Sequence, residues 1–147
     1  MVVKINAPVA HCSISIRYNE SKVEAGEASV LFTMNIPDPS NPMATFEEYE
    51  RGSLRCEKMS FPASIDPSKG DKMSDKDIEE FAKKLMEKLG YGDQPYIVYK
   101  HSDIDRVHYH IVSVRVDKEG RKINDSNERK RCHQILKDLA AEFGYKV

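Results

Sequence analysis

Three histidines lie close together in the chain and suggest its chemistry most directly. His101, His108 and His110 form the pattern H-x6-H-x-H, and the last pair lies in an apolar, β-branched run. Side chains alternate between the two faces of a strand, so His108 and His110 must share one face, about 7 Å apart. Two imidazoles on one face, with a third nearby, indicate a divalent-metal site.

The place of the third ring depends on a β-hairpin. Residues 96–101 and 107–116 are typical of two strands joined by a short polar connection. If His101 lies opposite His108, then Tyr99 and all three histidines share one sheet face. A register slip of one residue would send His101 to the other face and destroy the site.

Three histidines alone do not choose the reaction. They suit catalytic zinc, whose fourth coordination position stays open for water, and they equally suit metal-assisted phosphoryl transfer. Asp103 and Asp105 in the hairpin connection are candidates for further ligands or for partners of the ligands. Simple loop solubility also accounts for both, and the residue pattern favours it.

Tyr18 is a second residue of interest. It is followed by Asn19 and Glu20 in a polar segment near the start of the chain. A phenol is weakly acidic and is a poor nucleophile without help from its surroundings. The pattern alone therefore favours an amphipathic surface tyrosine.

Composition places the chain among soluble globular proteins. It has 147 residues, 32% of them charged, and a formal net charge of −1. We expect one domain over residues 1–147, either a compact protein or the N-terminal part of a longer one. No apolar run is long enough to cross a bilayer, and the three cysteines show no CxxC spacing. A reducing cytoplasm is the expected compartment.

Two helices are clearest among the elements that must position these residues. Ser74 is a good N-cap for a helix over 75–89, and Gly90 follows it where a C-terminal glycine is favoured. A second apolar stripe predicts a helix over about 128–143. Strands in the middle of the chain with helices on either side predict an α+β fold with an antiparallel sheet.

The first half of the chain gives weaker signals. A strand is expected at 2–5, and residues 12–25 read partly as strand and partly as helix. Thr45 is expected to cap a short helix over 46–51, and a strand is expected around 55–61.

Three segments resemble a known family. The histidine motif, with the strand that continues from it to Ile123, resembles the third motif of relaxases, mobilization nucleases of the HUH endonuclease superfamily. Residues 18–28 are similar to the amino-terminal motif that carries the nucleophilic tyrosine in one branch of these proteins. Residues 90–101 resemble the stretch that leads into the histidine motif, so the resemblance covers most of the chain in the same order.

This resemblance implies a fold and a mechanism. The fold is a central antiparallel sheet of about five strands, flanked by helices, with the histidine strand in the middle. His101, His108 and His110 would hold one divalent ion, Mg²⁺ or Mn²⁺ in the first place and Zn²⁺ or Ni²⁺ as alternatives. Tyr18 would attack the scissile phosphate and form a 5′-phosphotyrosine, with Glu20 or the ion helping to deprotonate the phenol.

The implied substrate is single-stranded DNA at a transfer origin, and the implied partners are accessory mobilization proteins. Phosphate-binding domains usually carry a basic excess, so the near-neutral net charge argues weakly against nucleic acid. A local cluster of basic residues can bind phosphates even when the net charge of the whole chain is near zero. The basic residues in this part of the chain are equally explained as solvated side chains of a turn and of the start of a helix. The residues expected to bind DNA are Arg115, Lys122, Arg129, Lys130 and Arg131.

Three other functions stay open. A rolling-circle replication initiator would share the chemistry and differ in its target. A three-histidine zinc hydrolase would use no tyrosine nucleophile. In a non-catalytic nucleic-acid binding platform, the histidines would be structural. The sequence indicates no membrane partner and leaves the oligomeric state open.

Overall fold

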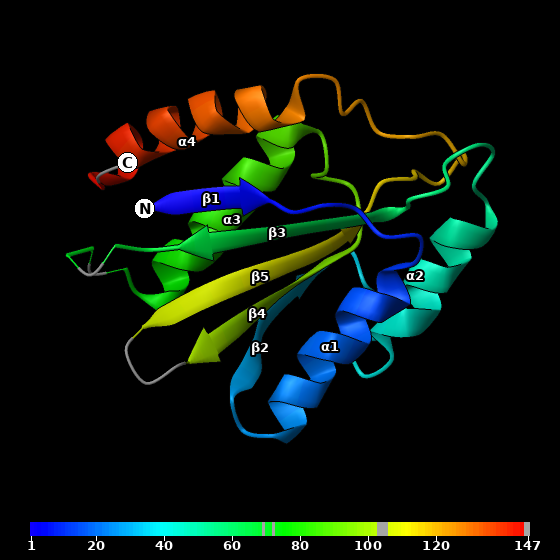
Figure 1. Ribbon diagram of the computed structural model, residues 1–147, viewed down its shortest axis with the longest axis horizontal. Coiled ribbons are helices and arrows are strands. Elements are labelled where there is room, and N and C mark those ends of the chain that lie inside the picture. Colours follow the sequence, from blue (N-terminus) through cyan, green and yellow to red (C-terminus); the bar gives the residue numbers. More distant parts are fainter. Residues whose placement is uncertain (69, 72, 103–105, 146–147) are drawn as a thin grey trace.

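The computed structural model describes residues 1–145 except 69, 72 and 103–105. In this part of the chain, five strands form one antiparallel sheet and four helices pack against it, which confirms the expected α+β fold (Figure 1). The strand order is β1-β3-β5-β4-β2, so the strand that carries His108 and His110 lies in the middle. The elements are β1 (Val2–Ile5), α1 (Cys12–Glu24), β2 (Ala28–Met34), α2 (Pro42–Arg51), β3 (Ser60–Asp66), α3 (Asp75–Leu89), β4 (Tyr96–Ser102), β5 (Val107–Val114) and α4 (Glu128–Phe143).

The helices cover both faces of the sheet. Ile111 points into a core with Phe81 of α3, whereas its neighbour Val112 points into a second core with Ile16 of α1 and Phe46 of α2. Figure 1 shows α1 and α2 in front of the strands and α3 behind them. The alternation of side chains along β5 thus divides the apolar residues between two layers of helix. No helix among the described residues is long and apolar enough to span a membrane.

The second half of the chain matches the sequence prediction closely. Ser74 accepts a hydrogen bond from the amide of Asp77, whose side chain bonds back to the Ser74 amide and completes a capping box at the start of α3. Gly90 ends the helix with φ at 97°, a left-handed conformation that glycine adopts without steric cost. Helix α4 also has the predicted bounds and is followed by a left-handed Gly144.

The first half corrects two predictions and resolves an ambiguity. Residues 12–24 are helical, as α1, and Ala25 is its C-cap. Helix α2 begins at Pro42, so Thr45 lies inside the helix and is not its cap. Proline is favoured in the first turn of a helix, where its missing N–H has no intrahelical partner to lose. Strand β3 occupies Ser60–Asp66 instead of 55–61, because this stretch pairs with both β1 and β5.

Candidate metal centre and nucleophile

The hairpin has the register that a three-histidine site requires. His101 on β4 pairs with His108 on β5, and Tyr99 pairs with His110. The ring centroids of the histidines lie 5.2 Å apart for 101 and 108, 4.3 Å for 101 and 110, and 5.0 Å for 108 and 110. The sequence prediction that all three share one face is therefore confirmed.

The geometry of the three rings suits one metal ion. One ligand atom from each histidine lies within 4.8 Å of the other two. Two nitrogens bound to one ion at the usual 2.0–2.1 Å lie at most about 4.2 Å apart, so small ring movements would complete the site. His101 is buried, and His108 and His110 are half-buried. Asp103 and Asp105, the other sequence candidates here, lie outside the described residues.

Asn19 of α1 orients the most buried ring. Its amide nitrogen donates to the backbone oxygen of Ser15 at 2.8 Å, which turns its side-chain oxygen toward His101. His101 Nε2 lies 2.7 Å from that oxygen. Because the oxygen can only accept, this contact requires a proton on His101 Nε2 and leaves Nδ1 as the nitrogen that could bind a metal ion. The residue pattern around Asn19 predicts no such role.

A second contact joins α1 to the histidine strands. The hydroxyl of Tyr99 donates to the Glu20 carboxylate at 2.8 Å, and burial followed by this hydrogen bond raises the pKa of Tyr99. Glu20 therefore holds α1 against β4. Residues two positions apart on a helix do not face each other, so this carboxylate is not directed at Tyr18. The general-base role expected for Glu20 stays a prediction.

Tyr18 lies on α1 directly before Asn19. Adjacent Cα atoms are about 3.8 Å apart, so the tyrosine backbone lies beside a residue that contacts the histidine cluster. Its side chain is 55% exposed, and Lys22 Nζ lies 5.7 Å from the ring centroid. The phenol is therefore accessible to a macromolecular substrate.

Strand β3 contributes a carboxylate near the histidines that the sequence analysis missed. Asp66 follows Ile65, which pairs with Tyr109, so Asp66 lies on the histidine face next to the position of His108. One of its oxygens is paired with Arg106 at 3.2 Å. The other, Oδ1, is buried and has no hydrogen-bond partner among the described residues. The strand expected over 55–61 ends before Asp66, so the sequence prediction did not place this carboxylate on the histidine face.

The basic residues expected to bind DNA lie away from the histidines. Arg115 lies five residues after His110, just beyond the end of β5, which is roughly 17 Å at the usual rise of a strand. Arg115 and Lys122 line one cavity, and Arg115 also lines an adjacent one with Arg129 and Lys130. The guanidinium of Arg131 is instead bonded to backbone oxygens of Asn124 and Ser126.

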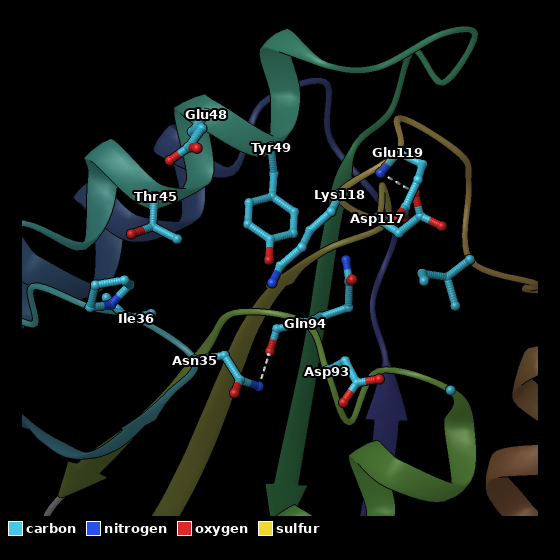
Figure 2. A pocket seen from close by; sticks show the side chains of 13 residues that line it. Asn35, Ile36, Thr45, Glu48, Tyr49, Asp93, Gln94, Asp117, Lys118 and Glu119 are labelled. Atoms are coloured by element: carbon cyan, nitrogen blue, oxygen red, sulfur yellow. Dashed lines mark hydrogen bonds between the residues drawn. The ribbon is translucent and has the colours of Figure 1, made fainter.

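A cavity of about 940 Å³ opens at the same far end of the sheet. Figure 2 shows Tyr49 of α2 pointing into it toward Lys118. Burial, followed by the charges of Glu48 and Glu119, raises the pKa of Tyr49, which disfavours the phenolate that a nucleophilic tyrosine needs. This cavity is therefore a poor place for the nucleophile.

Of three comparisons with known proteins, the one with protein families gives a match. No curated protein and no solved structure matches the chain significantly. The family of relaxases with a MobA/VirD2-like nuclease domain matches residues 18–145, a range that includes Tyr18 and all three histidines. This match spans most of the sequence, and the antiparallel sheet with a central histidine strand is consistent with it. The chain therefore belongs to the relaxase family, as a MobA/VirD2-like nuclease domain.

Proposed function

We propose that this relaxase domain nicks one DNA strand at a transfer origin and holds the cleaved strand covalently on Tyr18. The family supports DNA nicking in mobilization as the general activity. The observation that carries the finer proposal is the convergence of three histidines beside the helix that bears Tyr18. A lone metal site would not need an exposed tyrosine at this place.

The proposed reaction is a transesterification. The phenolic oxygen of Tyr18 forms a bond to the scissile phosphorus, and the bond from phosphorus to the 3′ oxygen breaks. The phenol loses its proton and the departing 3′ oxygen gains one, which leaves a 5′-phosphotyrosine and a free 3′-hydroxyl. The strand is thus cut while its phosphoester bond energy is kept for rejoining.

His101, His108 and His110 would hold the divalent ion, with Mg²⁺ or Mn²⁺ as the proposed species. Such an ion polarises the phosphate and offsets the charge that develops on it. The protein residues around the centre fix the ligands. Asn19 sets the proton position of His101, and Asp66 Oδ1 is placed to accept a hydrogen bond near the rings.

Tyr18→Phe tests the nucleophile. Wild-type protein is incubated with Mn²⁺ and single-stranded DNA carrying the transfer-origin sequence, and the covalent adduct is measured on a denaturing gel. We expect Tyr18→Phe to abolish the adduct and to keep metal affinity, whereas the matched control Tyr49→Phe forms the adduct normally. Adduct formation by Tyr18→Phe would refute the assignment.

His108→Ala tests the metal site. We expect this variant to lose both Mn²⁺ binding, measured by calorimetry, and adduct formation. Unchanged Mn²⁺ affinity would refute the three-histidine centre. Turnover of a small ester by zinc-loaded protein, unaffected by Tyr18→Phe and without any DNA adduct, would show that the chain is a zinc hydrolase instead.

A further inference from the structure

Arg115 is a buried cation whose hydrogen-bond donors are not all paired within the described residues. It is 4% exposed and lies just beyond the end of β5. Its Nε donates to the backbone oxygen of Ser60 at 3.0 Å, and its Nη1 donates to the Tyr91 hydroxyl at 3.1 Å and to Glu128 at 2.9 Å. Nη2 makes no hydrogen bond to any described residue. The guanidinium is therefore fixed in place with one donor group left over.

That side chain lines a cavity of about 730 Å³ whose other charges are mainly basic. Two acidic residues, Glu57 and Asp125, oppose the basic ones, and Asp125 is paired with Lys122 at 3.0 Å and with Arg115 at 3.6 Å. The basic excess remains after this pairing, so the cavity attracts anions. The basic lining residues are Arg55, Lys58, Arg115, Arg121 and Lys122.

One wall of the cavity is apolar and firmly held. Leu54 is 70% exposed, an unusual exposure for a large apolar side chain, and Pro8 lies on the same lining. The Leu54 amide donates to the backbone oxygen of Gly120 at 3.0 Å, which ties the wall to the turn after β5. Basic side chains beside an apolar wall match the chemistry of a nucleotide, which has an anionic group and a flat apolar face.

We propose that this cavity binds one nucleotide of the DNA strand, with its phosphate on Arg115 Nη2, Lys58 and Arg121, and its base against Leu54. The choice of DNA as the source of the nucleotide rests on the proposed function. Arg115, on the lining of the cavity, lies roughly 17 Å beyond His110 along the direction of β5. At about 3.4 Å per nucleotide, a stacked strand needs about five nucleotides to reach it.

The test uses the double variant Lys58→Ala/Arg121→Ala, because both side chains are exposed and their loss leaves the core intact. Binding of a fluorescent 16-residue oligodeoxythymidine is measured by anisotropy at several salt concentrations. We expect about tenfold weaker binding at low salt. The slope of log affinity against log salt should fall by about 0.7, the value for one lost phosphate contact on a single strand.

A matched control removes the same charge elsewhere. Lys83→Ala/Lys88→Ala changes two exposed lysines of α3, and we expect affinity and slope to stay near those of the wild type. Leu54→Ala should weaken binding without changing the slope, because it removes only the apolar contact. Equal losses in the two double variants, or no loss in Lys58→Ala/Arg121→Ala, would overturn the proposal.

Two further arms identify the source of the nucleotide and separate this inference from the proposed function. Thymidine monophosphate and inorganic phosphate should compete only weakly with the oligonucleotide. Competition as strong as that of the unlabelled oligonucleotide would make this a free-nucleotide site and overturn the DNA assignment. If wild-type protein forms no adduct while Lys58→Ala/Arg121→Ala still weakens DNA binding, the proposed function fails and this inference stands.

Discussion

Replacing Asn19 is the sharpest test of how the metal centre is organised. Asn19 lies on α1, is buried, and is the hydrogen-bond partner that fixes the proton of His101 on Nε2. Asn19→Ala removes the acceptor but leaves all three histidines in place. The change therefore separates the orientation of a ligand from its presence.

The magnitude of this effect follows from burial. His101 is 5% exposed, so a ring N–H that loses its acceptor finds little water to replace it. Leaving such a donor unsatisfied costs about 1–3 kcal/mol. The same loss lets the ring rotate or change tautomer, and loss of a ligand's partner typically lowers metal affinity by about 10- to 100-fold. Since tenfold in affinity corresponds to about 1.4 kcal/mol, this loss of affinity corresponds to about 1.4–2.8 kcal/mol of metal-binding free energy.

The assay is a calorimetric titration with Mn²⁺. We expect Asn19→Ala to bind about 10- to 100-fold more weakly than the wild type. Asn19→Asp should recover most of the affinity, because a carboxylate also accepts from Nε2. Asn35→Ala is the matched control: this amide bonds to the backbone oxygens of Gly92 and Gln94 at the far end of the sheet, and its loss should leave metal affinity unchanged.

Mn²⁺ affinity within twofold of wild type, in a folded Asn19→Ala protein, would refute this reasoning. It would mean that His101 does not bind through Nδ1 as its tautomer predicts, or that His101 is not a ligand. His101→Ala then decides between these two explanations. Unchanged affinity in that variant removes His101 from the site, and lost affinity keeps it as a ligand through the other nitrogen.

Three further changes test the frame around the site. Glu128→Ala should lower the free energy of unfolding in urea by about 3–5 kcal/mol, because it leaves Arg115 buried without its closest anion; a loss below 1 kcal/mol would contradict this. Gly120→Ala should cost more than about 1 kcal/mol in the same assay, since φ is +80° and a Cβ would overlap a backbone carbonyl of the adjacent loop. Lys122 bonds to Asp125 and lowers the pKa of that carboxyl below its usual 3.8. Ionised Asp125 therefore stabilises the fold above pH 3.8, and this stabilisation is lost as the pH falls through the lowered pKa. The difference in Tm between wild type and Asp125→Asn should therefore be present at neutral pH and shrink below pH 3.8, and a constant difference would count against it.

The sequence predicted those elements whose local signals and tertiary context agree. Helix α3 has an N-cap, an apolar stripe and a terminal glycine, and all three specify the same bounds. The β4–β5 hairpin was also predictable, because a register slip of one residue would send His101 to the opposite face from His108 and His110. These agreements made the metal cluster the most predictable part of the site.

Strand β2 was not predicted from the sequence, for a physical reason. Its pairing with β4 shifts register between Val30 and Phe32, so a bulge interrupts the alternation by which strands are recognised. The role of Asn19 was also out of reach, because an asparagine in a polar segment gives no sign of a buried partner on a strand more than 80 residues away along the chain. Contacts between segments that are distant in the sequence can be identified only from the folded structure.

The near-neutral net charge argued weakly against DNA binding. The spatial separation of acidic and basic residues removes this argument. Acidic residues gather around the 940 Å³ cavity, where Glu48, Asp93, Asp117 and Glu119 oppose a single lysine. Basic residues dominate the 730 Å³ cavity. The two groups nearly cancel in the total but not in space, and a phosphate backbone responds to the local field. A strand leaving the histidine centre would therefore be repelled from the first cavity and attracted to the second.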